Sequence, residues 1–119
     1  MLSLPIESSG DYQKRVQSYF LVVNAVDNID EVTISSGFFY RPGSEVQVSF
    51  GDAKFNLFTH KNLAWSYNKN DDLEILKQMR QDLDVVVTAF DKNNKYAIDK
   101  YSLIGFKEAY KKMKESCNF

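Results

Sequence analysis

The sequence is poor in the residues from which small metal and catalytic centres are built. Its 119 residues include one histidine, His60, and one cysteine, Cys117. A structural zinc site needs about four His or Cys ligands, so this pair cannot supply one. A single cysteine cannot form a disulfide within the chain either. The residues therefore predict no metal and no cofactor, and they leave Cys117 either as a free thiol or as half of a bridge to another chain.

Reactive side chains also lack the arrangements that are typical of hydrolases. The run Ser35-Ser36-Gly37 has no leading glycine and so does not form a nucleophile elbow. His60 is expected in a turn beside Lys61, and a neighbouring ammonium group disfavours a general base. The sequence therefore predicts that this protein is not an enzyme. One catalytic alternative stays open, a hydrolase that uses His60 with nearby acids, and it requires His60 to lie in a cleft and not on the surface.

Net charge and long apolar runs are lacking as well. Fifteen Lys and Arg residues stand against sixteen Asp and Glu residues, which gives a net charge of −1 and predicts no nucleic-acid partner. No apolar run approaches the roughly 18 residues that cross a bilayer, so the chain is not expected to be transmembrane. The acidic stretch 27–31 lacks the spacing of a calcium-binding loop and predicts a solvated turn. The first residues carry no signal-peptide pattern, which leaves open a cytoplasmic location or an export signal outside this chain.

Short apolar and aromatic runs between turn residues make up most of the chain. The hydrophobic fraction of 44% and the aromatic fraction of 14% suffice for the core of one domain, residues 1–119. Strands are expected at residues 19–23, 32–40, 46–50, 55–59, 63–67, 83–90 and 96–101, after an irregular or edge-strand lead-in over residues 1–15. Helical spacing predicts a short helix at about 71–81 and a C-terminal helix at about 103–115. The pattern is typical of an all-β fold, an antiparallel β-sandwich or a small barrel.

Several residues carry more specific expectations within this pattern. Asp71 or Asp72 is expected to cap the first helix, whose apolar stripe contains Leu73, Leu76 and Met79. Ser102 is expected to cap the last helix. Gly37 predicts a bulge or a close approach of two backbones, and Gly105 is expected to let the last helix approach the sheet. Phe58 makes the second face of the strand at 55–59 partly apolar.

Aromatic side chains are the best candidates for a binding surface. Phe38, Tyr40 and Trp65 are expected in the core, but if they were exposed together they would form an interaction patch, because aromatic residues dominate interface energetics. A binding module for a macromolecular partner is therefore the first functional hypothesis. A carrier of a small ligand, with an apolar cavity inside the β structure, is the second.

Several short sequence words resemble, in order and spacing, the landmarks of the invasion-associated locus B family of bacterial proteins. These words are Asp30-Glu31-Val32, Gly37-Phe38, Pro42-Gly43-Ser44-Glu45-Val46, Phe55-Asn56-Leu57-Phe58 and Ala64-Trp65. The run from Asp99 to Tyr110 resembles the closing signature of that family, in which a strand ends in D-x-Y-S-L-x-G-F and enters the last helix. The resemblance implies a bacterial, periplasmic or secreted, β-sandwich-like protein that has no established enzymatic activity and is linked by its family name to host-cell invasion.

The resemblance also implies a role for the cysteine. Cys117 looks like the C-terminal cysteine of the family, whose partner belongs to a leading strand that this chain lacks. An absent leading strand would leave an open sheet edge, and open edges pair with other chains. We therefore expect a homodimer that is joined at this edge or through Cys117, in addition to an unidentified protein or cell-surface partner.

Overall fold

The computed structural model describes residues 2–11, 14–23 and 30–117, without the side chains of residues 114, 116 and 117. These ranges form nine strands and two helices. The strands are β1 Leu2–Ser3, β2 Glu7–Gly10, β3 Tyr19–Val23, β4 Glu31–Ser35, β5 Glu45–Phe50, β6 Ala53–His60, β7 Leu63–Trp65, β8 Asp84–Phe90 and β9 Tyr96–Ser102. The helices are α1 Lys69–Gln81 and α2 Phe106–Cys117. The expected β-rich fold with two short helices is confirmed.

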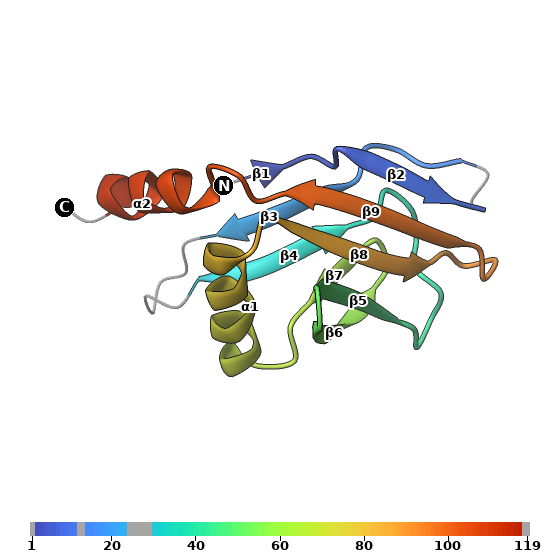
Figure 1. Ribbon diagram of the computed structural model, residues 1–119. Helices are drawn as coiled ribbons and strands as arrows, with labels where there is room; N and C mark the ends of the chain where they lie inside the picture. Colours follow the sequence, from blue (N-terminus) through green and yellow to red (C-terminus); the bar gives the residue numbers. More distant parts are fainter. Residues whose placement is uncertain (1, 12–13, 24–29, 118–119) are drawn as a thin grey trace.

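All nine strands belong to one antiparallel sheet that curls into a half-barrel (Figure 1). The strand order is β1-β3-β4-β7-β6-β5-β8-β9-β2. The two end strands are consecutive in the chain, since β1 pairs with β3 and β2 pairs with β9 on the opposite side. The N-terminal segment thus connects the two ends of the sheet, with Pro5 between its two strands. The expected edge-strand lead-in is confirmed, whereas a homodimer joined at an open edge stays a prediction.

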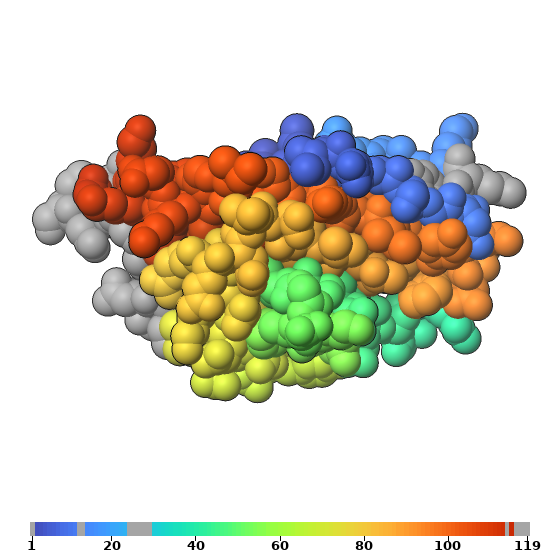
Figure 2. All heavy atoms as spheres, viewed as in Figure 1, coloured from blue at the N-terminus to red at the C-terminus, as the bar shows by residue number. Residues whose placement is uncertain are grey.

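The core lies on the concave face of the sheet. Strand β5 shows the reason: Val46, Val48 and Phe50 are buried, and the residues between them are more exposed. Because side chains alternate between faces in a strand, this pattern places one face inside and one outside. Cross-strand partners share a face, so the same alternation continues into β8, where Val85, Val87 and Ala89 are buried. The molecule is elongated, with extents of 45 × 27 × 26 Å (Figure 2).

Helix α1 closes the core at one end of the sheet. Ile75, Leu76 and Met79 are at most 2% exposed and belong to the apolar core. The expected cap is wrong, because the side chain of Asn68 accepts a hydrogen bond from the Asp71 N–H. The expected apolar stripe is confirmed at Leu76 and Met79. It is wrong at Leu73, which is 48% exposed, and it omitted the buried Ile75.

Asp72, one of the two acids expected to cap α1, has another role. Asp72 is buried, and its Oδ1 accepts a hydrogen bond of 3.2 Å from the backbone N–H of Val32 in β4. Burial raises the pKa of Asp72, and the hydrogen bond from the Val32 N–H offsets part of that increase. A residue expected at a helix end therefore ties α1 to the sheet.

The strand expected at residues 32–40 ends at Ser35. Gly37 lies in the left-handed region with φ of +83°, and a Cβ there would lie 2.0 Å from the Val16 carbonyl oxygen. The segment before β3 passes close to Gly37 at this point, since the Val16 N–H donates a 2.9 Å hydrogen bond to the Gly37 carbonyl. The expected close approach at Gly37 is thus confirmed. It also explains why residues 38–40 leave the sheet, which Tyr40 meets again only in a bridge to Asp91.

The turn between β9 and α2 also differs from the expectation. Ser102 ends β9, and its hydroxyl accepts a hydrogen bond from the Ile104 N–H, while α2 begins four residues later at Phe106. Gly105 has φ of +83°, but a Cβ there would meet nothing within 4 Å. The left-handed backbone conformation of this turn therefore requires glycine at position 105. A close approach of α2 to the sheet does not require it. Phe106 is 3% exposed and fills the core.

Neither α1 nor α2, over the part of the chain described, combines the length with the apolar run that a bilayer crossing needs.

Candidate interaction site

The three aromatic residues predicted as an interaction patch do not share one surface. Phe38 and Tyr40 contact each other edge to face, with ring centroids 5.7 Å apart. Tyr40 is only 4% exposed. Trp65 is the cross-strand partner of Thr33, whereas its neighbour Ala64 pairs with the buried Ile34. Trp65 therefore lies on the convex face of the sheet, away from the core that contains Tyr40.

Trp65 instead forms an aromatic cluster with two residues that the prediction did not include. The Phe58 ring centroid lies 5.4 Å from that of Trp65 and 5.5 Å from that of Tyr67. Phe58 is 37% exposed and Tyr67 is 56% exposed, while Trp65 is half-buried. We call Phe58, Trp65 and Tyr67 the outer aromatic patch. Phe58 lies in β6, Trp65 in β7 and Tyr67 in the loop between β7 and α1. The green spheres of β6 and β7 adjoin the yellow spheres of α1 in Figure 2.

Strand pairing explains how these rings meet. Phe58 is paired with Trp65 on one side and with Glu45 on the other, so all three side chains occupy the convex face. The Tyr67 hydroxyl donates a hydrogen bond to Oε2 of Glu45. This hydrogen bond raises the pKa of Tyr67, and the phenol stays neutral near pH 7. The patch therefore combines three contiguous apolar rings with a polar edge, a composition that is typical of protein interfaces.

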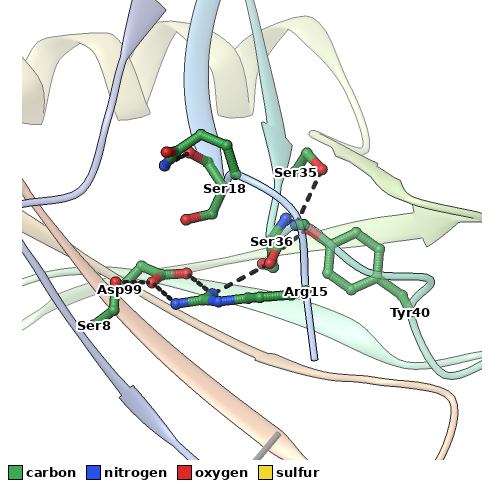
Figure 3. A network of polar contacts seen from close by, with 9 residues as sticks. Ser8, Arg15, Ser18, Ser35, Ser36, Tyr40 and Asp99 are labelled. Atoms are coloured by element: carbon green, nitrogen blue, oxygen red, sulfur yellow. Dashed lines mark hydrogen bonds and ion pairs between the residues drawn. The ribbon is translucent and has the colours of Figure 1, made fainter. Parts of the chain in front are cut away.

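The concave side contains a second notable cluster, and it is polar (Figure 3). Arg15 makes two hydrogen bonds of 2.7 Å with the two carboxylate oxygens of Asp99 and a third, of 3.2 Å, with the Ser36 carbonyl oxygen. The Ser8 hydroxyl donates to Oδ1 of Asp99 at 2.7 Å. The side chains of Arg15 and Asp99 are 9% and 1% exposed. This cluster joins Ser8 of β2 and Arg15, which follows β2, to Asp99 of β9, which is 84 or more positions away in the sequence.

Two buried tyrosines lie at the edge of the polar cluster. Tyr40 accepts a 2.8 Å hydrogen bond from the Ser36 N–H, and its hydroxyl lies 3.0 Å from Oγ of Ser36. Burial raises the pKa of Tyr40 to about 12, and the charge of Asp99 adds to the increase. Burial also raises the pKa of Tyr101, again reinforced by Asp99. Both phenols are therefore neutral in the working pH range.

The polar cluster is suited to holding the fold together. Both oxygens of Asp99 are engaged by Arg15, and the pair is almost fully covered, so neither group is presented to a substrate. Ser35 and Ser36 are buried, and Ser35 Oγ accepts a 3.3 Å hydrogen bond from the Gly37 N–H. The cluster therefore has a structural role: through Arg15 it connects the segment before β3 to Ser36 and to Asp99 of β9.

The remaining predicted residues are dispersed. His60 ends β6 and is exposed, and the hollow that it lines contains no acidic residue among the described side chains. The geometry required for a hydrolase centred on His60 is not found there. Cys117 is the last residue of α2, and its side chain lies outside the described residues.

Metal-ligating residues do not gather in the described part of the chain. No group of three or more His, Cys, Asp or Glu side chains is placed to hold a metal ion within residues 2–11, 14–23 and 30–117. The acidic stretch at 27–31 falls partly outside these ranges. Asp30, which is described, is 2% exposed and accepts a hydrogen bond from the Tyr110 hydroxyl.

The fold and these clusters define the class: a curled antiparallel β module with an exposed aromatic patch. Comparison with protein-family models, with curated proteins and with solved structures finds no match for this chain.

Proposed function

We propose that this chain is a non-catalytic interaction module of the bacterial envelope, of the invasion-associated locus B kind, that binds a protein partner through the outer aromatic patch. The exposed cluster of Phe58, Trp65 and Tyr67 carries the proposal. Rings of this kind are usually found in the core, and a contiguous exposed group marks an interaction surface. Trp and Tyr are also the residues most enriched among those that dominate binding energy.

The distribution of reactive groups supports a binding role over a catalytic one. The largely buried charges of Arg15 and Asp99 neutralise each other. The imidazole of His60 is exposed beside Lys61, without a described acid in the hollow it lines. The protein thus offers surface for recognition, whereas the buried ion pair of Arg15 and Asp99 serves folding.

The family assignment within this proposal is supported by the closing signature. Asp99 and Tyr101 are buried on one face of β9, and Phe106 fills the core after the turn. These three residues of the closing signature therefore have a structural role in this chain. A periplasmic or secreted location and a link to host-cell invasion form part of the same proposal.

A cell-binding assay with one matched pair of variants tests the proposal. Fluorescently labelled protein is titrated onto cultured epithelial cells, and bound protein is measured by flow cytometry. We expect saturable binding, its loss after protease treatment of the cells, and an affinity at least about 10-fold lower for Tyr67→Ser. The matched control is Tyr96→Ser, an equivalent change of a tyrosine that is 40% exposed on β9, and it should bind like the unmodified protein.

Two results would contradict the proposal. One is equal binding by the Tyr67→Ser and Tyr96→Ser proteins, which would remove the outer aromatic patch from recognition. The other is the absence of saturable, protease-sensitive binding, which would remove the protein partner. Circular dichroism of each variant shows whether the fold is retained.

A further inference from the structure

A separate hollow lies where three segments of the chain meet. These segments are at the end of the molecule opposite the helices (Figure 1). It has a volume of about 650 Å³ and lies between the lead-in segment at 14–16, the loop at 37–39 and the β8–β9 hairpin at 91–95. We call it the loop-end cleft. Its volume falls within the range of small-molecule sites, about 300–1,000 Å³, and it is open to solvent and not enclosed in the barrel.

The walls of the loop-end cleft are apolar. Val16 is 77% exposed and Phe39 is 56% exposed, which is unusual for side chains of this type. Phe38 completes the wall and is held in place by its edge-to-face contact with Tyr40. The Val16–Gly37 backbone contact fixes the two walls relative to each other. An apolar surface is therefore exposed to water in a concave form.

The rim of the loop-end cleft is positively charged. Lys14, Lys92 and Lys95 line it, all three are exposed, and none has a carboxylate partner among the described residues. Asp91 is the single described acid in the lining, is 8% exposed, and uses Oδ1 to accept the N–H groups of Asn93 and Lys95 at 2.9 Å. The charge of Arg15 is neutralised by Asp99. Positive charge is therefore in excess at the rim.

We propose that the loop-end cleft binds a small amphipathic carboxylate, in which an apolar body contacts Val16, Phe38 and Phe39 and the carboxylate lies among the three lysines. Charge complementarity selects an anion, and the apolar walls select a hydrocarbon body. The concave shape favours a small molecule over a protein surface, which would not enter it. This site is independent of the outer aromatic patch, so either proposal can fail without the other.

Titration of the full chain with octanoate tests this proposal. Binding is followed by the amide resonances of Gly37 and Asn93 in two-dimensional NMR, with octanoate kept below micelle formation. Acetate supplies the charge without the chain, and 1-octanol supplies the chain without the charge. We expect octanoate to shift the cleft resonances saturably, with an affinity at least 10-fold higher than that of either fragment.

Variants with equal net charge separate a specific site from general attraction. The triple change Lys14→Gln, Lys92→Gln and Lys95→Gln should lower octanoate affinity at least 10-fold. The control changes three other exposed lysines in the same way, Lys54→Gln, Lys77→Gln and Lys111→Gln, and should leave the affinity unchanged. Phe39→Ser should weaken binding of octanoate as well.

Three outcomes would overturn the proposal. Octanoate could leave the cleft resonances unshifted, 1-octanol could bind as tightly as octanoate, or the two triple variants could lose affinity equally. Addition of anionic phospholipid vesicles distinguishes a membrane surface from a free amphiphile. Broadening that depends on the vesicles, without a response to octanoate, would also count against the small-molecule site.

Discussion

The two ends of the molecule are built on different physical principles. At the helix end, α1 and α2 place Ile75, Leu76, Met79 and Phe106 against the sheet, and apolar packing provides the stability. At the loop end, the segments are joined by the buried pair of Arg15 and Asp99, with the loop-end cleft beside it. An apolar contact tolerates many partners, whereas a buried ion pair requires one geometry. We infer that packing stabilises the first end and that the polar cluster defines the conformation of the second.

The largest effect is expected from breaking the polar cluster on one side only. Arg15→Met leaves the carboxylate of Asp99 buried without a cation, which should cost about 3–5 kcal/mol in the free energy of unfolding. Urea denaturation measures this loss. The double variant Arg15→Met with Asp99→Leu removes both charges and should regain much of it.

A surface ion pair provides the control for this experiment. Lys100 and Asp84 lie 3.6 Å apart, and their side chains are 37% and 46% exposed. Lys100→Met should cost less than about 1 kcal/mol, because exposed pairs contribute little. Equal losses for Arg15→Met and Lys100→Met would show that the loop end does not depend on its buried charges.

The helix end should respond to loss of volume. Leu76→Ala removes a side chain that is 2% exposed, and the resulting cavity should cost about 2–5 kcal/mol. Leu73→Ala makes the same chemical change on the same helix, where the side chain is 48% exposed, and should cost no more than about 0.5 kcal/mol. Similar midpoints in urea for the two variants would contradict the placement of α1.

High pH should weaken the loop end through its buried phenol. The pKa of Tyr40 in the folded protein is about 12, against an ordinary value of 10.0. The folded state therefore binds the proton more tightly, and stability that is complete below pH 10 is lost as the pH rises toward 12. The loss is on the order of 2–3 kcal/mol at most.

Tyr40→Phe provides the corresponding measurement. The free energy of unfolding is followed between pH 8 and pH 11.5, and the variant should show a shallower decline by about one proton. The larger part of the decline remains in this variant, because Tyr101 and Tyr110 also have raised pKa values. An unchanged slope would mean that the Tyr40 hydroxyl does not titrate from a buried position.

The smallest difference is expected between two glycines that share a backbone conformation. Gly37 and Gly105 both have φ of +83°, so replacing either by alanine should cost about 1 kcal/mol in strain. Only at Gly37 would the new Cβ meet the Val16 carbonyl oxygen, and this clash should add about 1–3 kcal/mol. Thermal unfolding of Gly37→Ala and Gly105→Ala measures the difference, and identical midpoints would contradict the crossing of the lead-in segment.

The local elements could largely be predicted from the sequence. Alternation at Val46, Val48 and Phe50 identified β5, and the helical spacing around Leu76 and Met79 identified α1. The expected caps at Asp71, Asp72 and Ser102 were wrong. Several nearby polar residues can cap a helix, and packing against the sheet decides between them.

The candidate sites were harder to predict. Trp65 was identified as a candidate and Phe58 was noted as an apolar residue on the second face of its strand, but Tyr67 was not considered. The patch forms only when β5, β6 and β7 pair in their observed register. No signal in the sequence indicated that Arg15 and Asp99 would meet, because 84 positions separate them.

The sequence by itself determined the β-rich class, the positions of most strands and turns, and the scarcity of residues for metal or nucleophilic chemistry. These properties follow from local spacing and composition. The tertiary structure decided which faces are buried, how Arg15 reaches Asp99, where the aromatic rings are exposed and where the loop-end cleft lies. These tertiary features depend on contacts between segments that are distant in the sequence, and the curl of the sheet determines those contacts.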